Sequence, residues 1–149
     1  MSESVMLWRG KLHGKPRPRF TRQGHAYTPS DYRKFEQAIA SEYVRQGGKF
    51  YTGEVEVTLM VARKSPKAVR DAQADIVTPD EDNLLKAFQD ALNGVAYADD
   101  KQVTRARVDK LPRRPKEEDE AVLIVRNVDR KTNEERIREW KRYTASTRS

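Results

Sequence analysis

The chain has no cysteine among its 149 residues, and this absence excludes several kinds of protein at once. A disulfide scaffold, a thiolate metal site and a cysteine nucleophile are all ruled out, and the composition suits a reducing compartment. Long hydrophobic runs are also missing, since the longest, such as residues 121–125, are far too short to cross a bilayer. The first residues lack the basic and then apolar pattern of a signal peptide. We therefore expect a soluble, cytoplasmic protein.

The chain is rich in charged residues. There are 30 lysines and arginines against 23 aspartates and glutamates, which gives a net charge of +7, and hydrophobic residues make up 36%. This length suits one domain with a modest core under an extensively charged surface. A basic surface attracts polyanions, so nucleic acid is the first partner to consider, although many basic proteins are merely soluble.

Hydrophobic periodicity and turn residues predict alternating strands and helices. Strands are expected at 5–12, 55–61, 102–111 and 121–128, and the last two are candidates for pairing with each other. A first helix is expected to begin at 28–31 and to end before Gly47. Two further helices are expected over about 82–93 and 133–143. The segments 64–78 and 112–120 are expected to be exposed connections, and 144–149 a disordered tail. This order predicts a single small α/β or α+β domain with a mixed sheet flanked by helices.

The most informative feature is a group of acids inside this basic chain, on and beside the second predicted helix. Asp80 lies at or just before the helix start, where the helix dipole favours an anion. Asp82 and Lys86 are four residues apart and therefore share a face. Asp99 and Asp100 follow after a short connection that can return them beside the helix. Such carboxylates are the hard oxygen ligands of Mg²⁺, which would activate a water molecule, and Lys86 could steady a substrate phosphate.

The same residues also have an ordinary interpretation. Acids in the first turn of a helix are common stabilisers, and the pair Asp82–Lys86 would be worth only ~0.3–0.5 kcal/mol. Asp99 and Asp100 could simply form a turn. Spacing alone therefore leaves a metal site and solvated acids as open alternatives.

The order of the motifs resembles the RusA family of Holliday junction resolvases, the crossover junction endodeoxyribonucleases. PDEDNLLK at 79–86, DALNG at 90–94 and DDKQV at 99–103 fit that family's D-x-D-N-x-x-K, D-A-L and paired D-D; GKPRPR at 14–19 and YTP at 27–29 fit its N-terminal half. The resemblance covers roughly residues 7–126. It implies a RusA-like nuclease domain over 1–130, and it leaves the role of a charged helix and flexible tail over 131–149 open.

Carried over by position, the resemblance implies metal ligands at Asp80, Asp82 and Asp100, a catalytic Lys86 and an auxiliary acid at Asp99. It implies a homodimer that nicks opposing strands of four-way junction DNA with Mg²⁺, or Mn²⁺ in its place, in DNA recombination and repair. No membrane and no small-molecule cofactor are expected, and a bacterial, phage or prophage origin fits. Two alternatives remain open, namely a nuclease of the same fold acting on forks or flaps, and a junction-binding protein that does not cut.

Contacts to DNA are expected from basic residues on a proline-stiffened segment and on one predicted strand. The candidates are Lys15, Arg17, Arg19 and Arg22, with Phe20 as a residue that stacks at the branch point, and Arg105 and Arg107. The alternative is that Phe20 belongs to the core and the arginines are solvated.

Overall fold

A four-stranded mixed β-sheet forms the centre of the fold. The structure, a computed structural model, describes residues 3–16, 19–20, 26–27, 30–65, 74–76, 79–113 and 118–148. The strands of the sheet are β1 (Glu3–Arg9), β4 (Val55–Ala62), β5 (Val103–Lys110) and β6 (Glu120–Asn127), in the order β1-β6-β4-β5. Two short strands, β2 (Arg19–Phe20) and β3 (Ala26–Tyr27), pair with each other apart from this sheet. The predicted single α+β domain with a mixed sheet is confirmed.

The expected pairing of the last two strands is wrong, because β4 lies between β5 and β6. It runs parallel to β5 and antiparallel to β6. The chain passes from β4 to β5 through helix α2 (Glu81–Leu92), and a helical crossover of this kind lays the second strand parallel to the first. The alternate residues of β4 are completely buried, as expected of a central strand: Val55, Val57, Leu59 and Val61.

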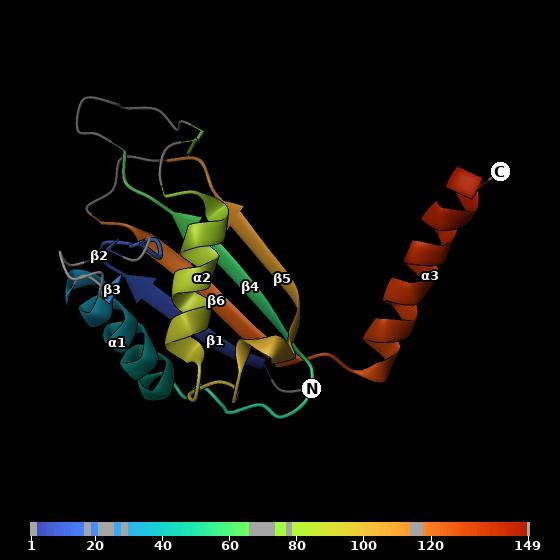
Figure 1. The fold of residues 1–149 in the computed structure, drawn as a ribbon, viewed down its shortest axis with the longest axis horizontal. Helices are drawn as coiled ribbons and strands as arrows, with labels where there is room; N and C mark the ends of the chain where they lie inside the picture. The colour runs from blue at the N-terminus through green and yellow to red at the C-terminus, as the bar shows by residue number, and fades with distance from the viewer. Residues whose placement is uncertain are drawn as a thin grey trace.

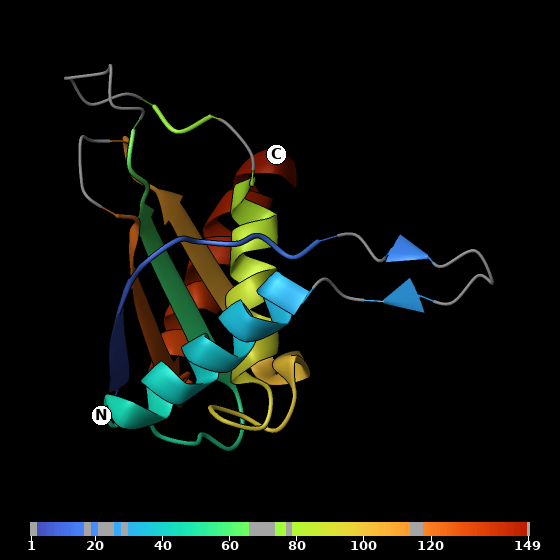
Figure 2. The same ribbon diagram turned by 90° about the vertical axis from the view of Figure 1, so that its left-hand side faces the viewer.

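Helices α1 (Ser30–Arg45) and α2 cover one face of the sheet, and none of the helices in the described part of the chain lies on the other face (Figure 1 and Figure 2). The apolar positions predicted for the first helix are all buried, namely Tyr32, Phe35, Ile39 and Tyr43. The ring of Phe35 packs edge-on against Phe88 of α2, with the ring centroids 5.9 Å apart. The helix ends before Gly47, whose φ of 84° suits glycine, while 28 and 29 of the predicted start lie outside the described residues.

The C-terminal helix α3 (Arg130–Arg148) is longer than predicted and diverges from the domain beyond β5 (Figure 1). A disordered tail from residue 144 was therefore a wrong prediction up to Arg148. The segment has no glycine or proline to end the helix, and the Thr144 hydroxyl donates to the carbonyl of Trp140 at 3.0 Å. Among the described residues, no helix has the length and apolar character needed to span a membrane.

Two connections that were expected to be exposed contain buried polar residues. Asp119 is 7% exposed because its carboxylate accepts the backbone N–H of Lys64 at 2.8 Å and that of Leu12 at 3.2 Å. Asp75 is 8% exposed and lies between Arg63 and Lys110. Each acid is paired with donors or cations far away in the sequence, which is why local polarity predicted the wrong environment. Residues 66–73, 77–78 and 114–117 of these connections lie outside the described residues.

Candidate active site

The predicted acids at the start of α2 lie where the sequence placed them. Asp80 is the N-cap residue of the helix, and its carboxylate accepts the backbone N–H of Asn83 at 3.3 Å. Asp82 follows in the first turn and forms an ion pair with Lys86 at 3.8 Å. Both side chains of that pair are more than half exposed, at 58% and 57%, so the pair contributes little to stability. The acids and the lysine are open to solvent and to a ligand.

The exposed face of α2 carries a third charged position that the sequence analysis did not select. Asp90 lies four residues beyond Lys86 and eight beyond Asp82, so the three side chains follow one face, opposite the buried Phe88. The ammonium group of Lys15 lies 2.6 Å from the carboxylate of Asp90. The N–H of Lys15 also donates to the carbonyl of Asn83 at 3.0 Å. The segment before β2 is thereby fixed along this face of the helix.

Asp99 and Asp100 lie at a short 3₁₀ helix, Asp100–Gln102, just before β5. The Asp99 carboxylate accepts the N–H of Lys101 at 2.8 Å, and this hydrogen bond holds the pKa of Asp99 below its usual value. The pKa of Asp100 is raised, first by partial desolvation of its carboxyl group and then by Asp99 and Asp90, while Lys15 opposes the rise. Asp90, Asp99, Asp100 and Lys15 therefore interact electrostatically as one group.

A buried tyrosine supports this second group of acids. Tyr97 is completely buried, and its hydroxyl donates to the carbonyl of Gln89 in α2 at 3.0 Å. Burial, followed by the charges of Asp100 and Asp90, raises the pKa of Tyr97 well above its usual value. Sequence analysis missed both Asp90 and Tyr97. The spacing of four residues from Lys86 was a signal for Asp90, whereas no local pattern marked Tyr97.

The acids thus form two groups, one at each end of α2. Asp82 and Asp90 are eight residues apart, and a helix rises about 1.5 Å per residue, so about 12 Å separates them along the axis. Within the part of the chain that the structure describes, no three His, Cys, Asp or Glu side chains gather closely enough to hold one metal ion. The structure does not bring Asp80, Asp82 and Asp100 together around a single point. Each group nevertheless offers hard carboxylate oxygens, and Mg²⁺ commonly takes only one or two carboxylates besides water and phosphate.

The predicted DNA contacts are dispersed. Arg17 and Arg22 lie outside the described residues, and the backbone of Arg19 and Phe20 forms β2. In the register of the sheet, Arg105 pairs with Glu56 and Arg107 with Thr58, on the face opposite α1 and α2. The guanidinium of Arg105 lies 3.4 Å from the Glu56 carboxylate, and Arg107 is exposed. These two arginines are therefore not beside the acids of α2, whereas Lys15 is.

Gly14 allows the segment that carries Lys15 to approach α2 closely. A Cβ atom at this position would lie 2.5 Å from Cβ of Pro79 and 3.3 Å from Cβ of Asn83. We expect Gly14→Ala to lower the free energy of unfolding by about 1–3 kcal/mol through overpacking and to displace Lys15 from Asp90. Urea unfolding and DNA cleavage assays measure the two effects.

Gly53→Ala is the matched control for this prediction. Within the described residues, no atom apart from those of its chain neighbours lies within 4 Å of a Cβ added at Gly53, and its φ of 77° is what opposes alanine. We expect that variant to lose about 1–2 kcal/mol of stability without losing cleavage. Equal cleavage by both variants would contradict the role given to the close approach at Gly14.

Comparison with known proteins assigns the class of this chain. The family model described as Endodeoxyribonuclease RusA matches residues 10–126. The chain therefore belongs to the RusA endodeoxyribonuclease family, as its motifs indicated. It is also similar to "Uncharacterized protein YqaN" of Bacillus subtilis (strain 168), with 30% identity over 118 residues that cover 66% of this chain and 83% of that protein. The family match ends within β6, so α3 lies outside it.

Proposed function

We propose that this protein is a divalent-metal-dependent endonuclease that resolves Holliday junctions by paired nicks in opposing strands, in DNA recombination and repair. The observation that carries the proposal is the row of charged side chains Asp82, Lys86 and Asp90 on one face of α2, with Asp80 at its start and Asp100 near its far end. The row follows the family's motif, and Asp82 and Lys86 are open to a large substrate, whereas Lys15 partly covers Asp90. A four-way junction has a two-fold axis, so a homodimer would present one active site to each of two equivalent strands.

The proposed metal ligands are Asp80 and Asp82 at one end of α2 and Asp100, with Asp99 beside it, at the other. Bound Mg²⁺ or Mn²⁺ would supply a water molecule of lowered pKa and would neutralise charge on the phosphate. The Asp80 carboxylate has one oxygen engaged with the N–H of Asn83, which fixes its orientation and leaves the second oxygen for a ligand. The Asp99 carboxylate is fixed in the same way by Lys101.

Lys86 is the residue proposed to contact the scissile phosphate. Its ammonium group is exposed and is held near Asp82 by a long ion pair of 3.8 Å. An ion pair of this length in solvent is weak, so a phosphate can replace Asp82 as the partner of Lys86 at small cost. The Lys15 ammonium is more tightly held, at 2.6 Å from Asp90, and its proposed role is to position that acid and to offset the negative charge near Asp100.

Removal of divalent metal is expected to abolish cleavage and to leave binding largely intact. The test uses a synthetic mobile four-way junction, with EDTA or with Mg²⁺ or Mn²⁺, and maps the products to nucleotide resolution. Symmetric nicks that appear only with metal and give ligatable duplexes would support the proposal. Equal cleavage of forks and four-way junctions would contradict resolvase specificity, and binding without cutting in either metal would contradict the nuclease function.

A further inference from the structure

Four segments of the chain meet in a hollow at one end of the central sheet. The ends of β1, β4 and β5 and the start of β6 lie together there, because β6 is antiparallel to its two neighbours and β5 is parallel to β4. The hollow has a volume of about 330 Å³, at the lower end of the range of ligand pockets. We call it the basic hollow, and its charged lining residues are Lys11, Arg63, Lys64, Arg113, Glu118 and Asp119.

The backbone around the basic hollow is held by the buried carboxylate of Asp119. One oxygen accepts the N–H of Lys64 at 2.8 Å, and the other accepts the N–H of Leu12 at 3.2 Å. The guanidinium group of Arg113 donates twice to the carbonyl of Lys64, at 3.0 and 3.3 Å. The positions of the cations are therefore set before a ligand arrives, which lowers the entropy that binding costs.

Cations outnumber acids in the lining of the basic hollow. Four lysine and arginine side chains line it together with two acids, and Asp119 already has both oxygens engaged with N–H groups. Arg63 is paired with Asp75 at 3.4 Å. Lys11 and Lys64 are exposed, and within the ranges that the structure describes neither forms an ion pair with a carboxylate. A concave surface with excess positive charge attracts an anion.

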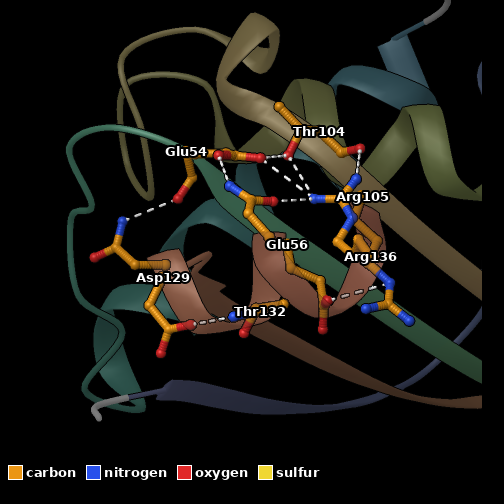
Figure 3. Close-up of polar contacts among 9 residues, drawn as sticks. Glu54, Glu56, Thr104, Arg105, Asp129, Thr132 and Arg136 are labelled. Atoms are coloured by element: carbon orange, nitrogen blue, oxygen red, sulfur yellow. Dashed lines mark hydrogen bonds and ion pairs between the residues drawn. The ribbon is translucent and has the colours of Figure 1, made fainter. Parts of the chain in front are cut away.

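The arginines near the start of β5 are paired more completely. Arg105 lies 3.4 Å from the Glu56 carboxylate, and Arg136 lies 3.3 Å from that of Glu54 (Figure 3). These cations would have to leave a carboxylate in order to bind a phosphate. Lys11 and Lys64 would not, and this difference favours the basic hollow as the place where an anion binds.

The basic hollow lies close to the acids at the start of α2. The ends of β4 and β5 and the start of α2 share one end of the domain (Figure 1). Three residues beyond Lys11, a Cβ added at Gly14 would lie 2.5 Å from Cβ of Pro79, the residue before Asp80. Three residue steps span at most about 11 Å. Since phosphates follow one another at about 3.4 Å of rise along a DNA strand, a strand at Asp80 has further phosphates within reach of Lys11.

We propose that the basic hollow binds a backbone phosphate of the DNA strand that lies along α2, a few nucleotides from the scissile phosphate. This inference rests on the proposed nuclease function and adds a second point of contact to it. Lys11 and Lys64 donate charge-assisted hydrogen bonds to the phosphate oxygens. A contact of this kind carries no sequence information, but it fixes the register of the strand against the acids of α2.

The first test measures binding of a labelled four-way junction in EDTA over a range of salt concentrations. The variant is Lys11→Gln with Lys64→Gln, whose side chains are exposed; the contacts of Lys64 described above come from its backbone. We expect the dissociation constant to rise about tenfold at low salt. The slope of log affinity against log salt concentration should become shallower by about 0.9, the value for one phosphate.

Lys49→Gln with Lys131→Gln is the matched control for this double variant. Both lysines are exposed at the opposite end of the sheet, one in the connection before β4 and one in the first turn of α3. The control removes the same charge, and distant charges in solvent are largely screened, so we expect less than about a twofold change in affinity. Equal losses of affinity in the two double variants would reflect net charge alone and would overturn the basic hollow as a binding site.

Glu118→Gln tests the same site in the opposite direction. Glu118 is exposed and lines the basic hollow, so removing its charge should tighten junction binding by about two- to threefold. Glu3→Gln is the control, because Glu3 is an exposed acid at the start of β1, at the other end of the sheet. Tighter binding by both variants alike would contradict a local effect at the basic hollow.

Neutral methylphosphonate groups locate the phosphate in the DNA. They replace one phosphate at a time on both sides of the cleavage site, and binding is again measured in EDTA. One replacement should weaken binding to the unaltered protein by about fivefold and have little further effect on Lys11→Gln with Lys64→Gln, because both changes remove the same contact. The absence of any position with this non-additive behaviour would overturn the inference.

The outcomes separate this inference from the proposed function, because the binding measurements contain no divalent metal. Binding without cutting in Mg²⁺ or Mn²⁺ would overturn the nuclease function, while a non-additive methylphosphonate position would still support the basic hollow. Metal-dependent junction cleavage with equal losses in the two double variants would keep the function and overturn the hollow. Calorimetric binding of inorganic phosphate that requires Lys11 and Lys64, without any methylphosphonate effect, would overturn DNA as the ligand in favour of free phosphate.

Discussion

Asp82→Asn is expected to reduce junction cleavage by about 10³-fold or more while junction binding is retained. The variant removes a charged oxygen ligand of the proposed metal ion, and metal-assisted charge stabilisation is worth several kcal/mol, at about 1.4 kcal/mol for each tenfold in rate. Binding should persist, because the loss of one negative charge does not weaken attraction to DNA. Single-turnover cleavage and gel-shift titration with the same labelled junction measure the two effects.

Glu81→Gln provides the matched control for Asp82→Asn. Glu81 is an exposed acid in the same first turn of α2, but it is not in the proposed ligand set. Both changes remove one charge from the same helix end, so a general electrostatic effect would appear equally in both variants. The Asp82–Lys86 pair is exposed and long, so the fold should survive either change. Normal nicking by Asp82→Asn would show that the metal assignment at this end of α2 is wrong.

Local sequence patterns were sufficient to predict the elements that hold the site. The spacing of Tyr32, Phe35, Ile39 and Tyr43 predicted α1, and the alternation from Val55 predicted β4, because burial on one face imposes a period on the sequence. The position of Asp80 as a helix cap was also readable, since short polar side chains at that position satisfy free N–H groups.

The strand order and the second group of acids depend on contacts that local patterns do not encode. Nothing in 103–110 or 120–127 specifies that β4 separates these strands. That arrangement follows from the crossover through α2. Lys15 meets Asp90 across 75 positions of sequence, and the surroundings of Asp100 are completed by that pair and by Asp99. Spacing along one helix therefore predicted the surroundings of Asp80 and Asp82 better than those of Asp90 and Asp100.

The charged C-terminal segment shows a further limit of reading a sequence by composition. Residues 133–143 were correctly predicted to be helical, but the role of this charged helix was left open. The structure adds the anchor of Asn133 and Arg136 to Glu54, a residue from the connection before β4. These contacts fix the start of α3 beside β5, and they join positions about 80 residues apart in the sequence.

The ion pairs of Asp75 connect the ends of β4 and β5 to the chain just before the candidate active site. The side chain of Asp75 is completely buried, with Arg63 at 3.4 Å and Lys110 at 3.6 Å from one carboxylate oxygen. The Lys110 ammonium group also donates to the carbonyl of Pro79 at 3.0 Å. Arg63 and Lys110 come from the ends of β4 and β5, so this cluster fixes the chain just ahead of the N-cap residue Asp80.

Asp75→Asn is expected to lower the free energy of unfolding by about 3 kcal/mol. Removing one partner of a buried ion pair typically costs about 3–5 kcal/mol. The lower end applies here, since Arg63 and Lys110 keep 16% and 11% exposure. Urea unfolding measures the loss, with Asp31→Asn in the exposed first turn of α1 as control.

The same variant should also slow cleavage, because Asp80 loses part of the support that holds the start of α2 in place. The cleavage defect is expected under conditions where Asp75→Asn is still fully folded, and it should be smaller than that of Asp82→Asn. A stability loss below about 1 kcal/mol, within the range of exposed pairs, would mean that the cluster is no stronger than a surface ion pair. If Asp75→Asn is destabilised but cleaves normally, the anchoring of the chain ahead of Asp80 is not needed for the geometry of the acids on α2.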